Sequence, residues 1–279
     1  MIGIDPSFGR NLLCFFVSEM NFNLRGKFAL VTGGSRGIGR RTALMLANEG
    51  CNVAICARDQ VWLEKTGSEL KASGVKTLSI SADVQKWEDI QRVFGAVMEA
   101  WGTIHILVNN AGGEGIRISD SPETIPDEMW VKSLELNTLS AVRFTRLAIP
   151  SMRKQKWGRV VTVASRHGRE GGGRAWYTMA KAAEIAFMKT LAMNFDLARD
   201  GITFNTVAPG AVLTEVGSWA DFMREEPEKL RAKLMSTRPM GRLGLPEEIG
   251  AVILFVCSEQ ASLLSGACIP VDGAESSAF

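Results

Sequence analysis

Tyrosine is the scarcest side chain of chemical interest in this 279-residue chain: Tyr177 is the only one, beside 13 phenylalanines and 7 tryptophans. A chain that used phenol rings only as apolar bulk with a polar end would be expected to contain several. The single phenol therefore requires an explanation of its own. It stands in 176-WYTMAKAAE-184, four residues before a lysine.

Histidine and cysteine are too few and too scattered to indicate a metal centre. The chain has 2 histidines, and its 5 cysteines form no CxxC pair, whereas zinc sites draw on clusters of these residues. We expect no metal, and we expect buried thiols in a cytoplasmic protein. The cysteines are Cys14, Cys51, Cys56, Cys257 and Cys268.

Strong net charge and long apolar runs are also missing. A formal net charge of +2 without a Lys/Arg block gives no basis for nucleic-acid binding. The early apolar run 12–17 is far too short to span a bilayer, and no convincing signal cleavage site follows it. We therefore expect no membrane partner. Because Met20 resembles a natural start, we interpret residues 1–23 as an extension.

Short β-branched apolar runs alternate with helical patterns through the remainder of the chain. Strand candidates are 28–33, 52–57, 76–81, 104–110, 159–165, 202–209 and 267–271, and helix candidates are 38–49, 60–73, 86–101, 127–154, 175–199 and 246–258. The strand runs are nearly continuously apolar, as in strands covered on both faces. This alternation predicts an α/β fold with a parallel sheet between two helix layers. We expect one domain, residues 24–279, with a substrate lid at about 211–245.

A glycine-rich turn, 32-TGGSRGIGR-40, joins the first strand to the first helix. Gly33, Gly37 and Gly39 give a G-x-x-x-G-x-G spacing. Glycines permit a tight turn and a close approach of the backbone, and the helix that follows presents unpaired N–H groups to a pyrophosphate. The strand–turn–helix context favours a nucleotide site over an ordinary turn.

Two arginines indicate which dinucleotide this turn binds. Arg36 lies within it, and Arg58 follows the second strand, where an acidic residue would bind the ribose hydroxyls of NAD. Arginine suits a 2′-phosphate instead, and Asp59 more plausibly caps the next helix. The sequence therefore favours NADP (NADPH) over NAD.

Tyr177 and Lys181 lie at positions i and i+4 of a predicted helix, and so on one face. A phenol has a pKa near 10, which is too high for base catalysis at neutral pH, but an adjacent ammonium favours the phenolate. Ser165 ends the fifth strand, at the edge where ligands bind in open α/β sheets. Its hydroxyl could donate to a carbonyl oxygen that gains charge.

In this order, the motifs make the chain similar to the short-chain dehydrogenase/reductase family, over about residues 24–273. The matching segments are 32-TGGSRGIG-39, 83-DV-84, 109-NNAG-112, Asn137, Ser165, 177-YTMAK-181, 209-PGAVLT-214 and 272-DG-273. The resemblance implies a Rossmann-type, doubly wound, seven-stranded parallel sheet in the order 3-2-1-4-5-6-7. The glycine turn after strand one and the NNAG turn after strand four then flank the switch point where such sheets bind ligands.

The resemblance also implies roles for single residues. Tyr177 is the general acid/base, Lys181 holds the nicotinamide ribose and lowers the pKa of the tyrosine, Ser165 orients the substrate oxygen, and Asn137 positions a relay water. Asn109 braces the central strands. The implied cofactor-binding set is Gly33, Ser35, Arg36, Gly37, Ile38, Gly39, Arg58, Asp83, Val84, Asn110, Ala111, Gly112, Tyr177, Lys181, Pro209, Gly210, Val212 and Thr214.

Some positions depart from the family pattern, and they bear on the substrate. Ala164 stands where a second serine is frequent, and the Ser165–Tyr177 spacing is one residue shorter than the commonest one. The intervening loop, 166-RHGREGGGRAW-176, is rich in arginine. One hypothesis is an anionic or polyhydroxylated carbonyl or alcohol substrate. The alternative is that these arginines pair with Glu170 or Glu114, or face solvent or a neighbouring subunit.

Several functions stay open at this point. The leading one is an NADP-linked carbonyl reductase or alcohol dehydrogenase, followed by a reductase of 3-oxoacyl thioesters on an acyl carrier. A different class is a nucleotide-binding sensor without chemistry. The resemblance further implies a homotetramer or homodimer paired through 127–154 and 175–199.

Overall fold

The computed structural model of the chain describes residues 21–114 and 121–278. Cys14, the expected start at Met20 and nearly all of the expected extension lie outside these residues.

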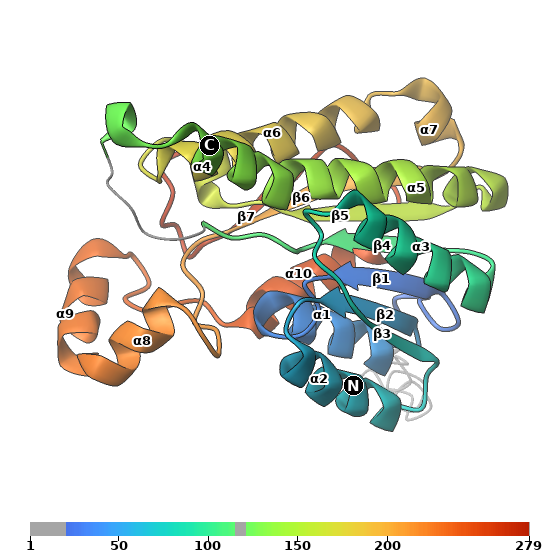
Figure 1. The fold of residues 1–279 in the computed structure, drawn as a ribbon, viewed down its shortest axis with the longest axis horizontal. Helices are drawn as coiled ribbons and strands as arrows, with labels where there is room; N and C mark the ends of the chain where they lie inside the picture. Colours follow the sequence, from blue (N-terminus) through green and yellow to red (C-terminus); the bar gives the residue numbers. More distant parts are fainter. Residues whose placement is uncertain (1–20, 115–120, 279) are drawn as a thin grey trace, which may run out of the picture.

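Within the described residues, one parallel sheet runs through the molecule in the order β3-β2-β1-β4-β5-β6-β7 (Figure 1). This confirms the strand order expected from the resemblance. The strands are β1 (Phe28–Thr32), β2 (Asn52–Ala57), β3 (Thr77–Ser81), β4 (Ile106–Asn109), β5 (Gly158–Val163), β6 (Ile202–Pro209) and β7 (Cys268–Val271). The order reverses between β1 and β4, which pair directly, so their carboxyl ends form the switch point.

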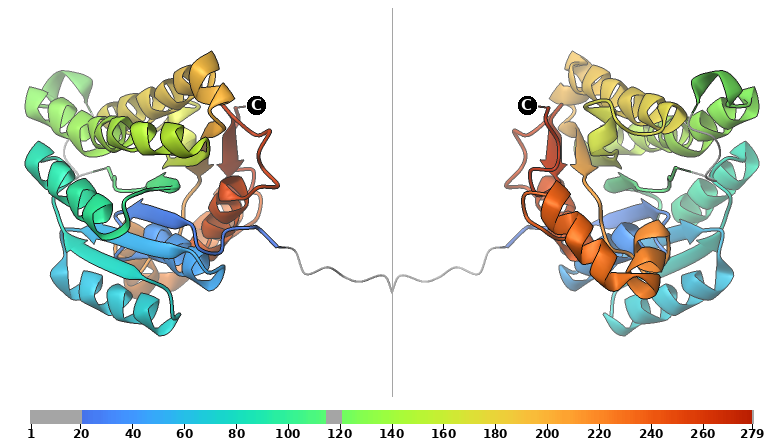
Figure 2. Two further views of the ribbon diagram at one scale, coloured as in Figure 1. Left: turned by 90° about the vertical axis from the view of Figure 1, so that its right-hand side faces the viewer. Right: turned by 90° about the vertical axis from the view of Figure 1, so that its left-hand side faces the viewer.

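Helices cover both faces of the sheet, as the two side views in Figure 2 show. The first layer packs through one buried cluster and the second through another. The first layer is α1 (Gly37–Asn48), α2 (Gln60–Ala72) and α10 (Pro246–Cys257). The second is α3 (Trp87–Trp101), α5 (Ser140–Gln155), α6 (Ala175–Ala192) and α7 (Phe195–Arg199).

Strand residues alternate between the two layers. Val31 and Ile55 belong to the first cluster, whereas Leu30 and Ala54 belong to the second. The central strands are therefore buried on both faces, as predicted. The edge strands β3 and β7 are only partly buried, because each has a neighbouring strand on one side only.

Two predicted long helices are interrupted. The 127–154 pattern consists of α4 (Asp127–Ser133), a π-helical segment η3 (Leu134–Leu139) and α5. The 175–199 pattern stops at Ala192, because the side chain of Asn194 accepts hydrogen bonds from the N–H groups of Asp196 and Leu197 and so begins a new helix. The hydrophobic periodicity of the sequence continues through both helix interruptions, so it does not reveal either of them.

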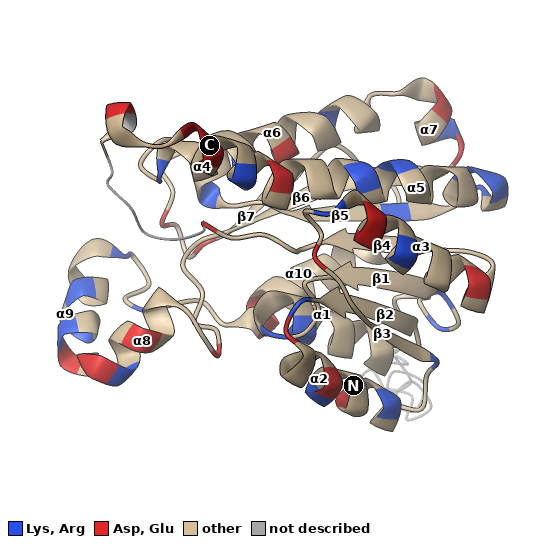
Figure 3. Cartoon of the chain, viewed as in Figure 1, with Lys and Arg blue, Asp and Glu red and all other residues tan. Residues whose placement is uncertain are grey.

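The segment 211–245 forms two helices, α8 (Ser218–Glu225) and α9 (Pro227–Thr237), which stand to one side of the sheet (Figure 1). It packs around a small apolar cluster of its own, made by Leu230, Leu234 and Leu243. Basic and acidic residues are interleaved along α8 and α9 (Figure 3).

Cys51, Cys56 and Cys257 are buried, and burial raises the pKa of Cys56 to about 12. Cys268 is only partly buried. In the part of the chain that the structure describes, every helix is too short or too polar to serve as a membrane span.

Candidate active site

The glycine turn is held against the carboxyl end of β4. Gly33 has a φ of 63°, and a Cβ there would lie 2.9 Å from the Cα of Ala111. The side-chain amide of Asn110 donates to the carbonyl oxygens of Thr32, at 2.9 Å, and Gly33, at 3.1 Å. A Cβ on Gly39 would lie 2.3 Å from that amide nitrogen. Both positions therefore require glycine, because a Cβ at either would collide with the turn after β4.

A hollow of about 380 Å³ opens beside this turn, between the ends of β1, β2 and β4. The expected cofactor residues that line it are Gly33, Ser35, Arg36, Arg58, Val84, Ala111 and Gly112. Arg36 and Arg58 are exposed at its rim. Asp59 caps α2 by accepting a hydrogen bond from the N–H of Trp62 at 3.2 Å, as expected. These residues fit a dinucleotide whose ribose carries a phosphate.

The amino terminus of α1 is occupied by a carboxylate from a distant part of the chain. Glu215 accepts a hydrogen bond from the N–H of Gly37 at 2.7 Å, and its other oxygen lies 3.7 Å from Nη1 of Arg40. The first turn of α1 has no acidic residue of its own. A negative group is stabilised at this position by unpaired N–H groups and the helix dipole. The helix end therefore has the chemistry that a pyrophosphate needs.

Ser165 and Tyr177 line a second, smaller hollow of about 150 Å³. Ser165 follows β5, and its Oγ accepts a hydrogen bond from the N–H of His167 at 3.2 Å. Tyr177 comes from the first turn of α6 and lines the same hollow, where the Ser165 side chain acts to lower the pKa of its phenol. The fold thus brings together the two hydroxyl groups that the sequence singled out.

The pKa of Tyr177 does not follow the simple expectation. Burial raises it, Lys181 acts to lower it, and Glu184 acts to raise it, with a net shift upward. The lysine therefore has the expected influence, but burial and a nearby carboxylate outweigh it. The expectation of a depressed pKa is wrong for the chain alone, because sequence spacing showed the ammonium and neither opposing effect.

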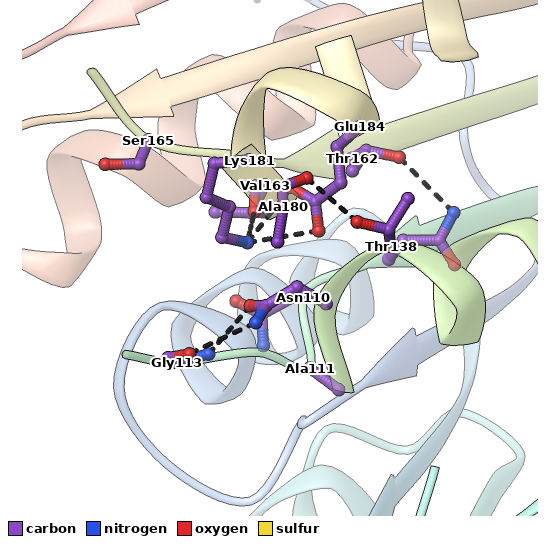
Figure 4. A network of polar contacts seen from close by, with 12 residues as sticks. Asn110, Ala111, Gly113, Thr138, Thr162, Val163, Ser165, Ala180, Lys181 and Glu184 are labelled. Carbon is purple, nitrogen blue, oxygen red and sulfur yellow. Dashed lines mark hydrogen bonds and ion pairs between the residues drawn. The ribbon is translucent and has the colours of Figure 1, made fainter. Parts of the chain in front are cut away.

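Lys181 is fixed by buried hydrogen bonds. Its Nζ donates to the carbonyl oxygen of Val163 at 2.9 Å and lies 3.0 and 3.1 Å from the two carboxyl oxygens of Glu184 (Figure 4). It also lies 5.7 Å from the centre of the Tyr177 ring. Lys181 is 3% exposed and Glu184 2%. Burial lowers the pKa of Lys181, but Glu184 and Tyr177 raise it more, so the ammonium remains charged.

Asn137 lies in the π-helical segment η3 and is completely buried. Its amide nitrogen donates to the carbonyl oxygens of Ser133, at 2.9 Å, and Gly113, at 3.2 Å, while its oxygen accepts from the N–H of Gly113 at 3.0 Å. A Cβ on Gly112 would lie 2.6 Å from that oxygen and 3.1 Å from Nζ of Lys181. Asn137, Lys181 and the turn after β4 therefore meet at one point.

Hydrogen bonds between neighbouring elements fix this arrangement. Asn109 donates to the hydroxyl oxygens of Thr145, at 3.1 Å, and Thr162, at 3.4 Å, which ties β4 to α5 and β5. The hydroxyl of Thr138 donates to the carbonyl oxygen of Ala180 at 2.9 Å (Figure 4). This hydrogen bond fixes the π-helical segment against α6.

The other expected cofactor residues lie in several places. Gly37 and Ile38 begin α1. Thr214 lines a wide cleft of about 910 Å³ beside α8, and Gly210 lines the smaller hollow with Tyr177. The carboxylate of Asp83 accepts from the N–H of Gln85 at 3.1 Å. Pro209 ends β6, and Val212 forms an isolated bridge with Gly244.

The arginines before Tyr177 are largely paired. Arg166 lies 2.7 Å from both Glu170 and Glu275, and Arg174 lies 2.9 Å from Glu114. Arg169 donates to Ser276 at 3.4 Å and to the carbonyl oxygen of Ala278 at 3.3 Å. The structure thus favours the paired alternative for the arginine-rich loop over a free anion-binding surface.

Sequence reasoning missed four charged residues around these hollows. Glu184 could have been suspected from its i,i+3 spacing to Lys181. Arg238 and Glu275 pair with each other beside Tyr177, and Glu215 reaches α1 from 178 residues away. No local pattern marks these last three, because their contacts join segments that are distant in the sequence.

The fold and site define a class of protein, and comparison with known proteins agrees. The family described as enoyl-(acyl carrier protein) reductase matches residues 33–274. The chain belongs to this family of short-chain dehydrogenases/reductases and is an NAD(P)-dependent oxidoreductase.

Individual relatives are similar over nearly their whole length. The chain is 36% identical to a 3-oxoacyl-[acyl-carrier-protein] reductase of Pseudomonas aeruginosa, covering 90% of this chain and 98% of that one. It is 32% identical to a D-beta-hydroxybutyrate dehydrogenase of Cupriavidus necator over 90% and 98%. Among solved structures, L-sorbose reductase from Gluconobacter frateurii, complexed with NADPH and L-sorbose, has a TM-score of 0.86 at 30% identity, covering 93% of this chain and 100% of that one.

Proposed function

We propose that the chain uses NADPH to reduce a small ketone that carries hydroxyl groups, or oxidises the corresponding secondary alcohol. The observation that carries the proposal is the compact hollow beside Ser165 and Tyr177, which is lined mostly by polar and charged side chains. The reaction class follows from the family, and the substrate class is argued from the hollow.

NADP(H) is the cofactor, in preference to NAD(H). Arg36 and Arg58 border the hollow at the end of β2, where a 2′-phosphate would lie. Solved relatives support this choice, because L-sorbose reductase was crystallised with NADPH and RhlG of Pseudomonas aeruginosa with NADP. When bound, the cofactor would supply or accept the hydride.

The side chains around the small hollow divide the remaining chemistry. Tyr177 gives a proton to the substrate oxygen in reduction and removes it in oxidation. Ser165, which lines the same hollow as Tyr177, orients that oxygen. Lys181 supplies a buried positive charge 5.7 Å from the Tyr177 ring centre, and Asn137 holds the turn beside it. The geometry supports these roles.

The lining of the small hollow favours hydroxyl groups over an anion or an acyl chain. Its acidic and basic side chains pair with one another, so that little net charge is left for an anion. Nδ1 of His167 and Nε of Arg238 are buried without a hydrogen-bond partner among the described residues. Burial lowers the pKa of His167, so its ring is neutral at pH 7. The charged or titratable lining residues are Glu114, Arg166, His167, Arg238 and Glu275.

Reduction of a 3-oxoacyl thioester is the second candidate, favoured by the 36% identity to a 3-oxoacyl-[acyl-carrier-protein] reductase. An acyl chain would need an extended apolar channel, and the volume of about 150 Å³ beside Tyr177 is small for it. The third function raised by the sequence, a silent nucleotide sensor, is set aside because the chain belongs to a family of NAD(P)-dependent oxidoreductases.

A substrate comparison tests the proposal. Initial rates with NADPH are measured for a neutral ketose, the same ketone without its hydroxyl groups, a keto acid and a 3-oxoacyl thioester. We expect kcat/KM for the ketose to exceed that for its deoxy analogue by at least about tenfold, because unpaired buried polar groups reject a substrate that cannot satisfy them. Arg238→Ala should reduce this preference, and exposed Arg224→Ala on α8 should not. A preference for the thioester would establish the second candidate.

Domain motion and assembly are further parts of the proposal. We infer that residues 24–279 act as one catalytic domain and that α8 and α9 close over the substrate as a lid. Their separate apolar cluster and the cleft of about 910 Å³ between them and Glu114 support this.

We also infer a homotetramer or homodimer paired through α5 and α6, which light scattering would test. Exposed Leu139, Met179 and Phe195 near these helices support it.

A further inference from the structure

Glu184 is a buried carboxyl group on α6 that the chemistry proposed above does not use. It is 2% exposed, and both of its oxygens lie about one hydrogen-bond length from Nζ of Lys181, at 3.1 and 3.0 Å. Buried ion pairs are weak evidence for stability, because apolar residues of similar volume often stabilise as well or better. A role in fixing or tuning Lys181 therefore explains this carboxyl group better than stability does.

We propose that Glu184 is a positioning residue for the reaction: its carboxylate orients the Lys181 ammonium and offsets part of the ammonium's charge at Tyr177. The proposal rests on the proposed function, since it requires Tyr177 to be the group that exchanges a proton with the substrate.

The orienting role follows from the hydrogen bonds of Lys181. An ammonium has three N–H donors. Val163 accepts one at 2.9 Å, and the two carboxyl oxygens of Glu184 accept at 3.1 and 3.0 Å. The ammonium also lies within 3.1 Å of the position that a Cβ on Gly112 would occupy. These fixed acceptors hold the ammonium in place beside the turn after β4.

The charge-offsetting role follows from the order of the three groups. Lys181 favours the phenolate of Tyr177, and the Glu184 carboxylate disfavours it. Interactions between charges are strong in such a buried setting, where little water screens them. Glu184 therefore keeps the phenol protonated to a higher pH. A protonated phenol is the form that can donate a proton when a ketone is reduced.

Other charged groups lie on the elements that pack against α6. The elements packed against α6 are η4 (Arg166–Gly168), α4, η3, β5, β6 and α7. Their titratable or charged residues are Arg166 and His167 on η4, Asp127, Glu128 and Lys132 on α4, Glu135 on η3, Arg159 on β5, and Asp196 and Arg199 on α7. Of the further charges, Glu114, beyond β4, is the one that also raises the pKa of Tyr177. Glu114 is unchanged in the variants below and acts equally in all of them.

The single tyrosine makes a direct test possible, because the near-ultraviolet phenolate band of the chain reports Tyr177 alone. The band is followed against pH in the wild-type chain and in Glu184→Gln, with circular dichroism to show that the fold persists. The measurement is made without cofactor and again with saturating NADP⁺, whose binding stabilises a marginal fold. We expect phenolate to form at lower pH in Glu184→Gln, by about one pH unit.

Two further variants keep this test specific. Asp200→Asn removes a carboxylate that pairs with Arg153 and Lys156 before β6, at the other end of the strands, and should leave the titration unchanged. Glu184→Asp keeps the charge but shortens the side chain, and should titrate between wild type and Glu184→Gln. If Glu184→Gln cannot be recovered folded, the titration of Glu184→Asp replaces it. Phenolate formation at lower pH than in the wild type supports the inference, and formation at an unchanged or higher pH overturns it.

The outcomes separate this inference from the proposed function. A titration in Glu184→Gln that is unchanged or moves to higher pH overturns the inference, even where Tyr177→Phe abolishes turnover. Retained turnover in Tyr177→Phe overturns the function, whatever Glu184 does to the titration.

Discussion

Glu215 accepts a hydrogen bond from the backbone N–H of Gly37 at 2.7 Å, at the first turn of α1 and across 178 residues of sequence. The carboxylate sits where the unpaired N–H groups and the dipole of α1 favour negative charge. A cofactor pyrophosphate at this helix end would have to displace it. Glu215 would therefore compete with a cofactor pyrophosphate proposed to bind at this helix end.

Replacing this competitor should strengthen cofactor binding. In Glu215→Gln we expect the Kd for NADPH to fall about two- to fivefold, since a charge at a helix end contributes ~0.3–1 kcal/mol. Isothermal titration calorimetry measures the change, with exposed Glu225→Gln on α8 as the matched control. An unchanged or higher Kd in Glu215→Gln would show that the carboxylate does not compete.

Arg58 should decide between the two nicotinamide cofactors. In Arg58→Ala we expect the Kd for NADPH to rise roughly 10- to 100-fold, because a hydrogen bond to a charged group contributes about 1.5–3 kcal/mol. Binding of NADH should change little. Arg41→Ala, which breaks the pair between Arg41 on α1 and Glu247 on α10, serves as the control. Equal losses for NADPH and NADH would refute the role assigned to Arg58.

Because Gly112 has no side chain, Asn137 and Lys181 can lie close to the turn after β4. In Gly112→Ala the new Cβ would lie 2.6 Å from Oδ1 of Asn137. We expect kcat with NADPH to fall at least tenfold, because even a small misplacement of reacting groups is costly. Gly95→Ala on α3, where a Cβ meets nothing within 4 Å, should keep full activity and gain about 0.5–1 kcal/mol in stability. Full activity in Gly112→Ala would contradict this reading of the site.

Much of this molecule could be predicted because its signals are local. The apolar runs predicted the strands of the sheet, and the spacing of Gly33 and Gly39 predicted the glycine turn. The structure shows both, including the close contacts of the turn. Tyr177 and Lys181 share a helix face by simple periodicity, and Ser165 lies at the end of the neighbouring strand.

What could not be predicted depends on distant contacts or on burial. The π-helical turn at Asn137 keeps the hydrophobic period of a helix, so the pattern conceals it. Glu184 resembles a surface charge in the sequence and is buried only because α6 packs its face inward. The net rise in the pKa of Tyr177 needs the summed effects of burial, Lys181 and Glu184, which spacing alone does not give.

The buried carboxyl should also affect how stability depends on pH. Burial raises the pKa of Glu184 from 4.5 to about 7. Between these values the native state keeps a proton that the unfolded state has released, so the free energy of unfolding falls as pH rises. Relative to Glu184→Gln, the wild-type chain should lose on the order of 1–3 kcal/mol across this window. Urea denaturation at a series of pH values measures it; a difference that stays constant or grows with pH would contradict the assignment.

The central claim is that the phenol of Tyr177 exchanges the proton during hydride transfer. Single-turnover oxidation of bound NADPH by a ketose, in wild type and in Tyr177→Phe, tests it most directly. We expect Tyr177→Phe to bind NADPH as the wild type does and to transfer hydride about 10²–10⁴ times more slowly. Transfer at an undiminished rate in a folded, NADPH-saturated Tyr177→Phe chain would contradict the account.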